Sequence, residues 1–149
     1  MGAIEPAIVT GGKDGTMEKK LAAVGLFVED IEKMVEFYRD VIGFSTDWTE
    51  GPHAGFEQAN INFMMYERKL LPEYLGEEVS YPKGLNGSFE IYIDLPFFED
   101  VDREFERVVK LGAKPIVNPR TEPWNMRTSY VADPEGNLIE IGSWGKGGK

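Results

Sequence analysis

The chain offers few side chains for metal or covalent chemistry, and the types that it has limit that chemistry. It contains one histidine, His53, and no cysteine among its 149 residues. Disulfides, thiolate nucleophiles and cysteine metal sites are therefore excluded. Non-haem iron dioxygenases bind Fe(II) with two histidines and a carboxylate, so one chain cannot form such a site and dioxygenase activity is not expected. A serine nucleophile would need His53 as its base, and no elbow motif surrounds any serine.

Acidic side chains are the reactive groups that remain. Asp and Glu number 26 against 16 Lys and Arg, which gives a formal net charge of -10. This charge disfavours partners that are themselves anionic, namely nucleic acids and acidic membrane surfaces. Carboxylates could bind magnesium or manganese. A pair of them in a partly dry pocket could instead act as a general base or receive a cationic ligand, because burial and mutual repulsion raise a carboxyl pKa.

An internal repeat shows which elements must position these groups. Residues 28–44 and residues 98–113 share one pattern, a hydrophobic residue followed by an acidic start, an apolar-periodic stretch and a closing glycine. Each copy follows an alternating segment rich in β-branched and aromatic residues, at 21–28 and 88–94. The repeat therefore predicts two strand-then-helix units.

Both repeated segments predict amphipathic helices with defined ends. In the first, apolar residues recur at spacings of three and four and so share one helix face: Ile31, Met34, Val35, Tyr38, Val41 and Ile42. Asp30 and Asp100 occupy positions where an N-cap carboxylate would accept the free amides of each helix. Gly43 and Gly112 occupy the left-handed positions that end each helix.

Short strand-like runs follow each predicted helix. They lie at residues 44–48, 55–58 and 61–66 in the first half, and at 114–118, 128–132 and 138–141 in the second. The turn Asp133-Pro134-Glu135-Gly136-Asn137 predicts a hairpin, because Pro presets one backbone angle and Gly or Asn tolerates the left-handed one. Each half thus predicts a βαβββ unit, and the chain an α+β fold.

A tandem pair of such units resembles the vicinal oxygen chelate superfamily, which includes glyoxalases, bleomycin-resistance proteins and extradiol dioxygenases. The resemblance covers roughly residues 20–144. It is carried by the stretch Phe27-Val28-Glu29-Asp30-Ile31-Glu32-Lys33, by the following Phe37-Tyr38 and Gly43-Phe44, and by Asp133-Pro134-Glu135-Gly136-Asn137-Leu138-Ile139-Glu140-Ile141.

The resemblance implies one domain at residues 19–145. Module one would span 19–67, a linker 68–86, and module two 87–145, with the two βαβββ modules forming a cupped eight-stranded mixed sheet whose helices lie outside. Residues 1–18 lack periodicity and are interpreted as a disordered leader.

The superfamily holds its catalytic metal with four inward-facing strand residues, usually His, Glu or Gln. The resemblance places these positions at Ala23, Asn62, Ser88 and Glu140, of which only Glu140 is a ligand of that kind; it is the residue that the resemblance marks as catalytic. A two-residue shift would place Glu90 on the same strand face. We therefore expect no resident cofactor; the alternative is a divalent metal bound by Glu140 and Glu90 with Asn62 and water.

Strand alternation extends this site to a cavity lining. If Ala23 and Glu140 face inward, so do small, aromatic and acidic neighbours: Gly25, Phe27, Asn62, Met64, Tyr66, Ser88, Glu90, Tyr92, Leu138 and Gly142. The opposite faces are apolar, as strands covered by helices require: Val24, Leu26, Phe63, Ile91, Ile139 and Ile141. The inward set is typical of a ligand site. In the alternative, Glu90 and Glu140 are solvated or pair with Arg120 or Arg127.

The segment 120–127 resembles the loop that leans over the cavity mouth in many superfamily members. Trp124 would stack on a planar ligand there, and Arg127 would bind an anionic group. The alternative for Trp124 is a dimer interface, where tryptophan is also enriched.

These features favour a small-molecule-binding protein similar to bleomycin-resistance proteins, which takes an aromatic or cationic compound without a catalytic metal. The alternatives are a divalent-metal-dependent, glyoxalase-like lyase or isomerase, and a dimerisation module whose cavity is filled by its own aromatic side chains. A homodimer is expected, because a second chain usually completes the cavities of this superfamily; pairing of the modules within or between chains stays open. The sequence shows neither a membrane span nor a secretory signal, so a cytoplasmic location is expected.

Overall fold

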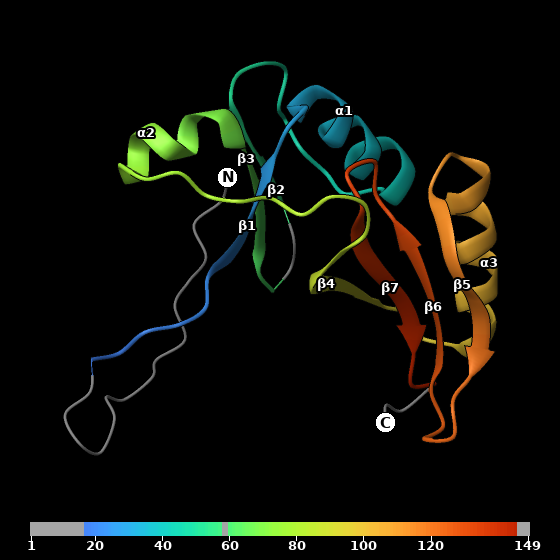
Figure 1. The fold of residues 1–149 in the computed structure, drawn as a ribbon. Helices are drawn as coiled ribbons and strands as arrows, with labels where there is room; N and C mark the ends of the chain where they lie inside the picture. Colours follow the sequence, from blue (N-terminus) through green and yellow to red (C-terminus); the bar gives the residue numbers. More distant parts are fainter. Residues whose placement is uncertain (1–16, 58–59, 146–149) are drawn as a thin grey trace.

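A computed structural model describes residues 17–57 and 60–145 (Figure 1). The elements are β1 (Ala23–Val28), α1 (Ile31–Glu36), the π-helix η1 (Phe37–Ile42), β2 (His53–Phe56), β3 (Asn62–Glu67), the 3-10 helix η2 (Arg68–Leu70), α2 (Leu71–Leu75), β4 (Asn86–Asp94), α3 (Phe98–Lys110), β5 (Lys114–Thr121), β6 (Arg127–Ala132) and β7 (Asn137–Ser143). Most of the predicted leader lies outside the described residues. None of the helices in the described part of the chain has the length and apolarity that crossing a bilayer needs.

The strands form two sheets built on the same plan. One has the order β1–β3–β2 and the other β4–β7–β6–β5. In each, the first strand runs parallel to the last, β1 with β3 and β4 with β7, while the hairpin partners are antiparallel. Helix α1 contacts β2 and β3, and α3 covers β5, β6 and β7 (Figure 1). The predicted α+β class and the repeated strand-helix plan are confirmed.

The strand predicted at residues 44–48 is reduced to one bridge, between Ser45 and Glu57. The hydroxyl of Thr46 donates to the Gly55 carbonyl at 2.6 Å and accepts from the Trp48 amide at 3.1 Å. Because a side chain here takes hydrogen bonds that a ladder would use, regular pairing stops. The described residues therefore contain seven strands in two sheets, where one eight-stranded cup was predicted.

The helix ends agree with the predicted caps at three of four positions. The carboxylate of Asp30 accepts the Lys33 amide at 3.1 Å, and Gly43 has a φ of 99°. Gly112 has a φ of 122° after α3. Asp100 is the exception: α3 begins at Phe98, so Asp100 lies within the first turn, where its carboxylate accepts the Phe97 amide at 3.1 Å.

One apolar core joins the helix-covered faces of both sheets. Its members include the predicted helix-facing residues Leu26, Phe63, Ile139 and Ile141, together with Ile91 at its edge. Between the two halves, the Tyr38 hydroxyl donates to the Asp133 carboxylate at 2.8 Å. Because burial of these apolar faces is the main favourable term in folding, the two sheets turn toward a shared core and expose their opposite faces.

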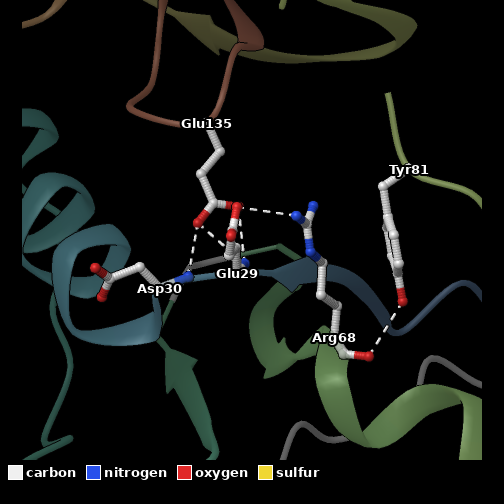
Figure 2. A network of polar contacts seen from close by, with 5 residues as sticks. All are labelled: Glu29, Asp30, Arg68, Tyr81 and Glu135. Atoms are coloured by element: carbon white, nitrogen blue, oxygen red, sulfur yellow. Dashed lines mark hydrogen bonds and ion pairs between the residues drawn. The ribbon is translucent and has the colours of Figure 1, made fainter. Parts of the chain in front are cut away.

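The β6–β7 turn also binds the start of α1 (Figure 2). The Glu135 carboxylate accepts the backbone amides of Glu29 at 2.9 Å and Asp30 at 2.8 Å. Arg68, which follows β3, donates to the Glu29 carboxylate at 2.9 Å, and its guanidinium lies 4.4 Å from the centre of the Tyr81 ring. The turn, the start of α1 and the segment after β3 are thereby held together.

Candidate functional site

The predicted site residues lie on the exposed faces of two different sheets. Phe27, Asn62, Met64 and Tyr66 belong to β1 and β3, while Ser88, Glu90, Tyr92 and Glu140 belong to β4 and β7. In the described part of the chain, no hydrogen bond or ring contact joins a member of one group to a member of the other. The predicted site is therefore divided into two half-sites, one on each sheet.

Carboxylates and hydroxyls form the half-site on the β4–β7–β6 surface. Glu140 lies between Tyr92 of β4 and Tyr130 of β6, its register partners, so these side chains share one face. The Thr128 hydroxyl donates to the Glu140 carboxylate at 2.5 Å, and the Tyr130 hydroxyl donates to the Glu90 carboxylate at 2.8 Å. Glu90, Glu140, Thr128, Tyr130 and Tyr92 are called the acid cluster below.

The acid cluster favours the neutral form of Glu140. Partial burial raises the pKa of this carboxyl group above its ordinary value, and a hydrogen bond to Glu90 with repulsion from its charge raises it further. The hydrogen bond from Thr128 acts in the opposite direction. Burial likewise raises the pKa of both Tyr92 and Tyr130, so their hydroxyls stay protonated as donors. Glu140 can therefore keep its proton to a higher pH than an ordinary glutamate.

This pKa shift predicts that Glu140 opposes folding at neutral pH. A carboxyl group whose pKa is higher in the folded state stabilises the fold fully below its unfolded-state pKa of about 4.3, and that stability is lost as pH rises through the folded-state pKa. The change Glu140→Gln fixes a neutral group, so we expect the melting temperature at pH 7 to rise by about 1–3 °C, a modest amount because the site is partly exposed.

The measurement is calorimetry of both proteins at pH 4 and pH 7. The gain should shrink toward zero at pH 4, where the wild-type carboxyl group is also protonated. Glu106→Gln on the exposed side of α3 is the control for a general loss of negative charge. An equal gain in that control, or a gain that is the same at both pH values, would contradict the assignment.

Aromatic side chains form the half-site on the β1–β3–β2 surface. The rings of Phe27 and Tyr66 have centroids 5.7 Å apart, and the Tyr66 hydroxyl donates to the Met64 sulfur at 3.5 Å. A side chain at Gly25 would approach the Tyr66 ring to 3.1 Å, so glycine leaves room for that ring. Asn62 lies at the start of β3, opposite Ala23.

Sequence reasoning missed two contributors to this surface. His53 was not among the expected lining residues, but it is the first residue of β2 and its ring lies 6.1 Å from that of Tyr66. The segment after β3 was expected as a linker, but its helix α2 lines a groove beside the same strands. Leu70, Leu71 and Leu75 around Tyr74 were the available signal, because apolar residues in a linker indicate packing or binding.

Trp124 and Arg127 occupy the β5–β6 hairpin on the second sheet. Trp124 lies at its tip and is 59% exposed. The Arg127 guanidinium donates to Asp102 of α3 at 2.6 Å and to the Thr121 hydroxyl at 2.9 Å. Arg120 pairs with Glu122. Neither arginine therefore forms the salt bridge to Glu90 or Glu140 that was considered from the sequence.

The residues at the four ligand positions do not fit the metal centre that the resemblance implies. Ala23 has no donor atom, and Asn62 and Glu140 belong to different half-sites. Across residues 17–57 and 60–145, no group of three or more His, Asp or Glu side chains gathers to hold a metal ion. The two close carboxylates, Glu90 and Glu140, are fewer protein donors than structural or catalytic metal sites use.

Comparison with known proteins gives consistent matches along most of the chain. Residues 20–141 match the family described as the Glyoxalase/Bleomycin resistance protein/Dioxygenase superfamily. Uncharacterized protein YraH of Bacillus subtilis (strain 168) is 33% identical over 126 residues, which cover 82% of this chain and 96% of YraH. A glyoxalase/bleomycin resistance protein/dioxygenase from Nocardioides superposes with a TM-score of 0.75 and 25% identity, covering 90% of this chain and 89% of that one. A glyoxalase-related enzyme from Fulvimarina pelagi superposes with a TM-score of 0.74 and 21% identity, covering 85% and 88%.

Proposed function

Because the chain belongs to the glyoxalase/bleomycin resistance protein/dioxygenase superfamily, we propose that it binds a small aromatic or cationic molecule on the exposed faces of its sheets, without a catalytic metal. The observation that carries this proposal is the acid cluster. Glu90 and Glu140 lie side by side on an exposed sheet face, both bound by hydroxyl donors, and within the described residues neither forms a salt bridge with Lys or Arg.

A cationic ligand group would offset the negative charge of the acid cluster. Two adjacent carboxyl groups cannot both ionise without repulsion, and this repulsion adds to the partial burial that raises the pKa of Glu140. A protonated amine or quaternary ammonium beside the pair would take the place of the proton on Glu140 and offset the charge of one carboxylate. The aromatic rings of Tyr92 and Tyr130 beside them could also contact such a cation through their faces. The formal net charge of -10 further favours the approach of cations.

We also propose a homodimer, because the two half-sites lie on different sheets and no hydrogen bond or ring contact among the described residues joins them. A second copy could place its aromatic half-site against the acid cluster of the first and so enclose a ligand. Trp124, exposed at the hairpin tip, is available either to this interface or to the ligand.

A second candidate function is that of a divalent-metal-dependent, glyoxalase-like lyase or isomerase. The adjacency of Glu90 and Glu140 favours it, since carboxylate oxygens are suitable ligands for magnesium or manganese. It would need further donors from the substrate, from water or from a second chain.

Titration calorimetry with benzyltrimethylammonium, a permanent aromatic cation, tests the first proposal. We expect binding that the double change Glu90→Gln and Glu140→Gln weakens by about tenfold, which corresponds to about 1.4 kcal/mol. Benzylsulfonate, of similar shape and opposite charge, should bind far more weakly. Equal binding of both probes, or binding that is insensitive to the double change, would contradict the proposal.

Metal analysis and thermal shift with magnesium, manganese, nickel and zinc separate the two candidates. Stoichiometric metal that is lost in Glu140→Gln would favour the enzyme. Light scattering after size-exclusion chromatography measures the oligomeric state, and a monomer at micromolar concentration would contradict the dimer.

A further inference from the structure

A groove of about 780 Å³ lies between α2 and the exposed face of the β1–β3–β2 sheet. Phe27 and Tyr66 line it from the strands, and Leu70, Leu71, Tyr74 and Leu75 line it from the η2–α2 segment. In Figure 1, α2 lies beside the upper end of β3, on the opposite side of the molecule from α3. A volume of this size lies within the range of about 300–1,000 Å³ that small-molecule sites occupy.

Several large apolar side chains that line the groove are exposed to solvent. Tyr74 is 87% exposed, Leu75 51%, Leu70 46% and Phe27 43%. Exposed apolar residues scattered singly are ordinary, but several of them gathered around one concavity mark a binding surface. None of these four belongs to the apolar core, so the fold does not account for their positions.

The charged residues of the groove are acidic. Glu67 and Glu73 line it, and no Lys or Arg of the described residues does. Lys69 pairs with Glu67 at 3.2 Å from outside the groove. His53 and Tyr66 border both this groove and a neighbouring hollow, which contains Asp47 and Glu57. An apolar ligand that also carries a carboxylate or phosphate would be repelled here, whereas one with a protonated amine would be attracted.

We propose that the groove binds the aromatic body of an amphipathic amine, a molecule with a flat apolar ring system and one protonated nitrogen. The inference rests on the proposed function, since Phe27 and Tyr66 belong to both sites, and it adds the class of ligand and the place of its apolar part. Faces of Phe27, Tyr66 and Tyr74 supply offset or edge contacts to a ring system, and Leu71 and Leu75 cover its edge. The η2–α2 segment is then one wall of the ligand site.

The sequence provides separate reporters for the two half-sites. His53 is the only histidine, so its imidazole gives one set of resonances beside the groove. Met64 accepts the Tyr66 hydroxyl on the same sheet. Met126 reports on the acid cluster, because its methyl group and the ring of Tyr92 border the same point beside Gly142. A side-chain carbon added at Gly142 would lie 3.0 Å from the Met126 methyl and 3.1 Å from the Tyr92 ring.

The test is a titration of the full chain, carrying ¹³C-labelled histidine and methionine methyls, with 2-(2-naphthyl)ethylamine. We expect saturable shifts of His53 and Met64, and at least about tenfold weaker binding of 3-(2-naphthyl)propanoate, in which a carboxylate replaces the ammonium group. The change Leu75→Ser should weaken amine binding by about fivefold. Leu111→Ser is the matched control, because Leu111 is 52% exposed and lies after α3, away from the groove.

The reporters distinguish failure of this inference from failure of the proposed function. Shifts of Met126 alone would overturn the groove and leave binding at the acid cluster intact. Shifts of His53 and Met64 alone would support the groove and overturn the acid cluster as the cation site. Equal binding of the amine and the propanoate, or equal effects of the two serine variants, would overturn the inference, and no shift of any reporter would overturn both proposals.

Discussion

Asp133→Ala is expected to lower the free energy of unfolding by about 3 kcal/mol or more. The Asp133 side chain is almost fully buried and accepts four hydrogen bonds, from the Tyr38 hydroxyl at 2.8 Å, the Glu135 amide at 2.9 Å, the Asn137 amide at 3.0 Å and the Asn137 side-chain amide at 2.9 Å. Alanine would leave all four donors without this acceptor, and the Tyr38 hydroxyl is itself buried. Hydrogen bonds to a charged group are stronger than neutral ones, and buried donors left unpaired are costly.

Urea denaturation followed by circular dichroism measures this loss. Tyr38→Phe removes only one of the four hydrogen bonds, so it should cost about 1 kcal/mol. Burial and the nearby Asp133 charge raise the pKa of Tyr38 well above its ordinary value, so its hydroxyl remains a donor across the neutral range. Asp40→Ala, at an exposed ion pair with Arg39, is the control and should change stability by less than about 0.5 kcal/mol. A loss at Asp133 no larger than at Asp40 would show that the buried cluster does not stabilise the fold.

Gly136→Ala is the second substitution with a large expected effect, about 3 kcal/mol of unfolding free energy. Gly136 has a φ of 90°, a conformation that side chains rarely adopt, and a β-carbon there would collide with the backbone carbonyl of Gly84. The two segments are held at this distance, because the Gly136 carbonyl accepts the Asn86 amide at 2.8 Å. Relief of the collision requires movement of backbone, which a packed structure resists.

Gly76→Ala is the matched control for that substitution. Gly76 also has a positive φ, 75°, but a β-carbon there meets no atom within 4 Å. Its replacement should cost only the backbone strain, about 1 kcal/mol. The difference between the two variants in thermal or urea unfolding isolates the contact with Gly84. Equal losses would mean that the linker moves freely away from the turn.

Asp133→Ala and Gly136→Ala both test the contacts of the β6–β7 turn. In the β6–β7 turn, Glu135 binds the amides before α1 (Figure 2). In the same turn, Asp133 binds Tyr38, and Gly136 binds the end of the linker. A five-residue turn thus contacts three segments that are distant in sequence. The turn is expected to set the relation between the two sheets and, with it, the separation of the two half-sites.

Local pattern in the sequence determined the elements and their faces. Alternation along each strand separated Leu26, Phe63 and Ile139 from Phe27 and Glu140, because successive strand residues point to opposite faces. Spacing of three and four defined the buried side of the first helix. Strand period placed Glu90 on the face of Ser88, and the resemblance placed that face on the side of Glu140. The structure places hydroxyl donors against both carboxyl groups.

Only the tertiary structure decided which of these faces meet. It separated the aromatic and acidic residues onto two sheets, directed Arg127 to Asp102, reduced the strand at 44–48 to one bridge, and brought α2 and His53 beside Tyr66. Periodicity predicts which face of one element is buried. It does not predict the direction of a loop, or which of several acidic side chains an arginine will bind. Those outcomes depend on long-range packing around the shared core and on the hydrogen bonds of a single turn.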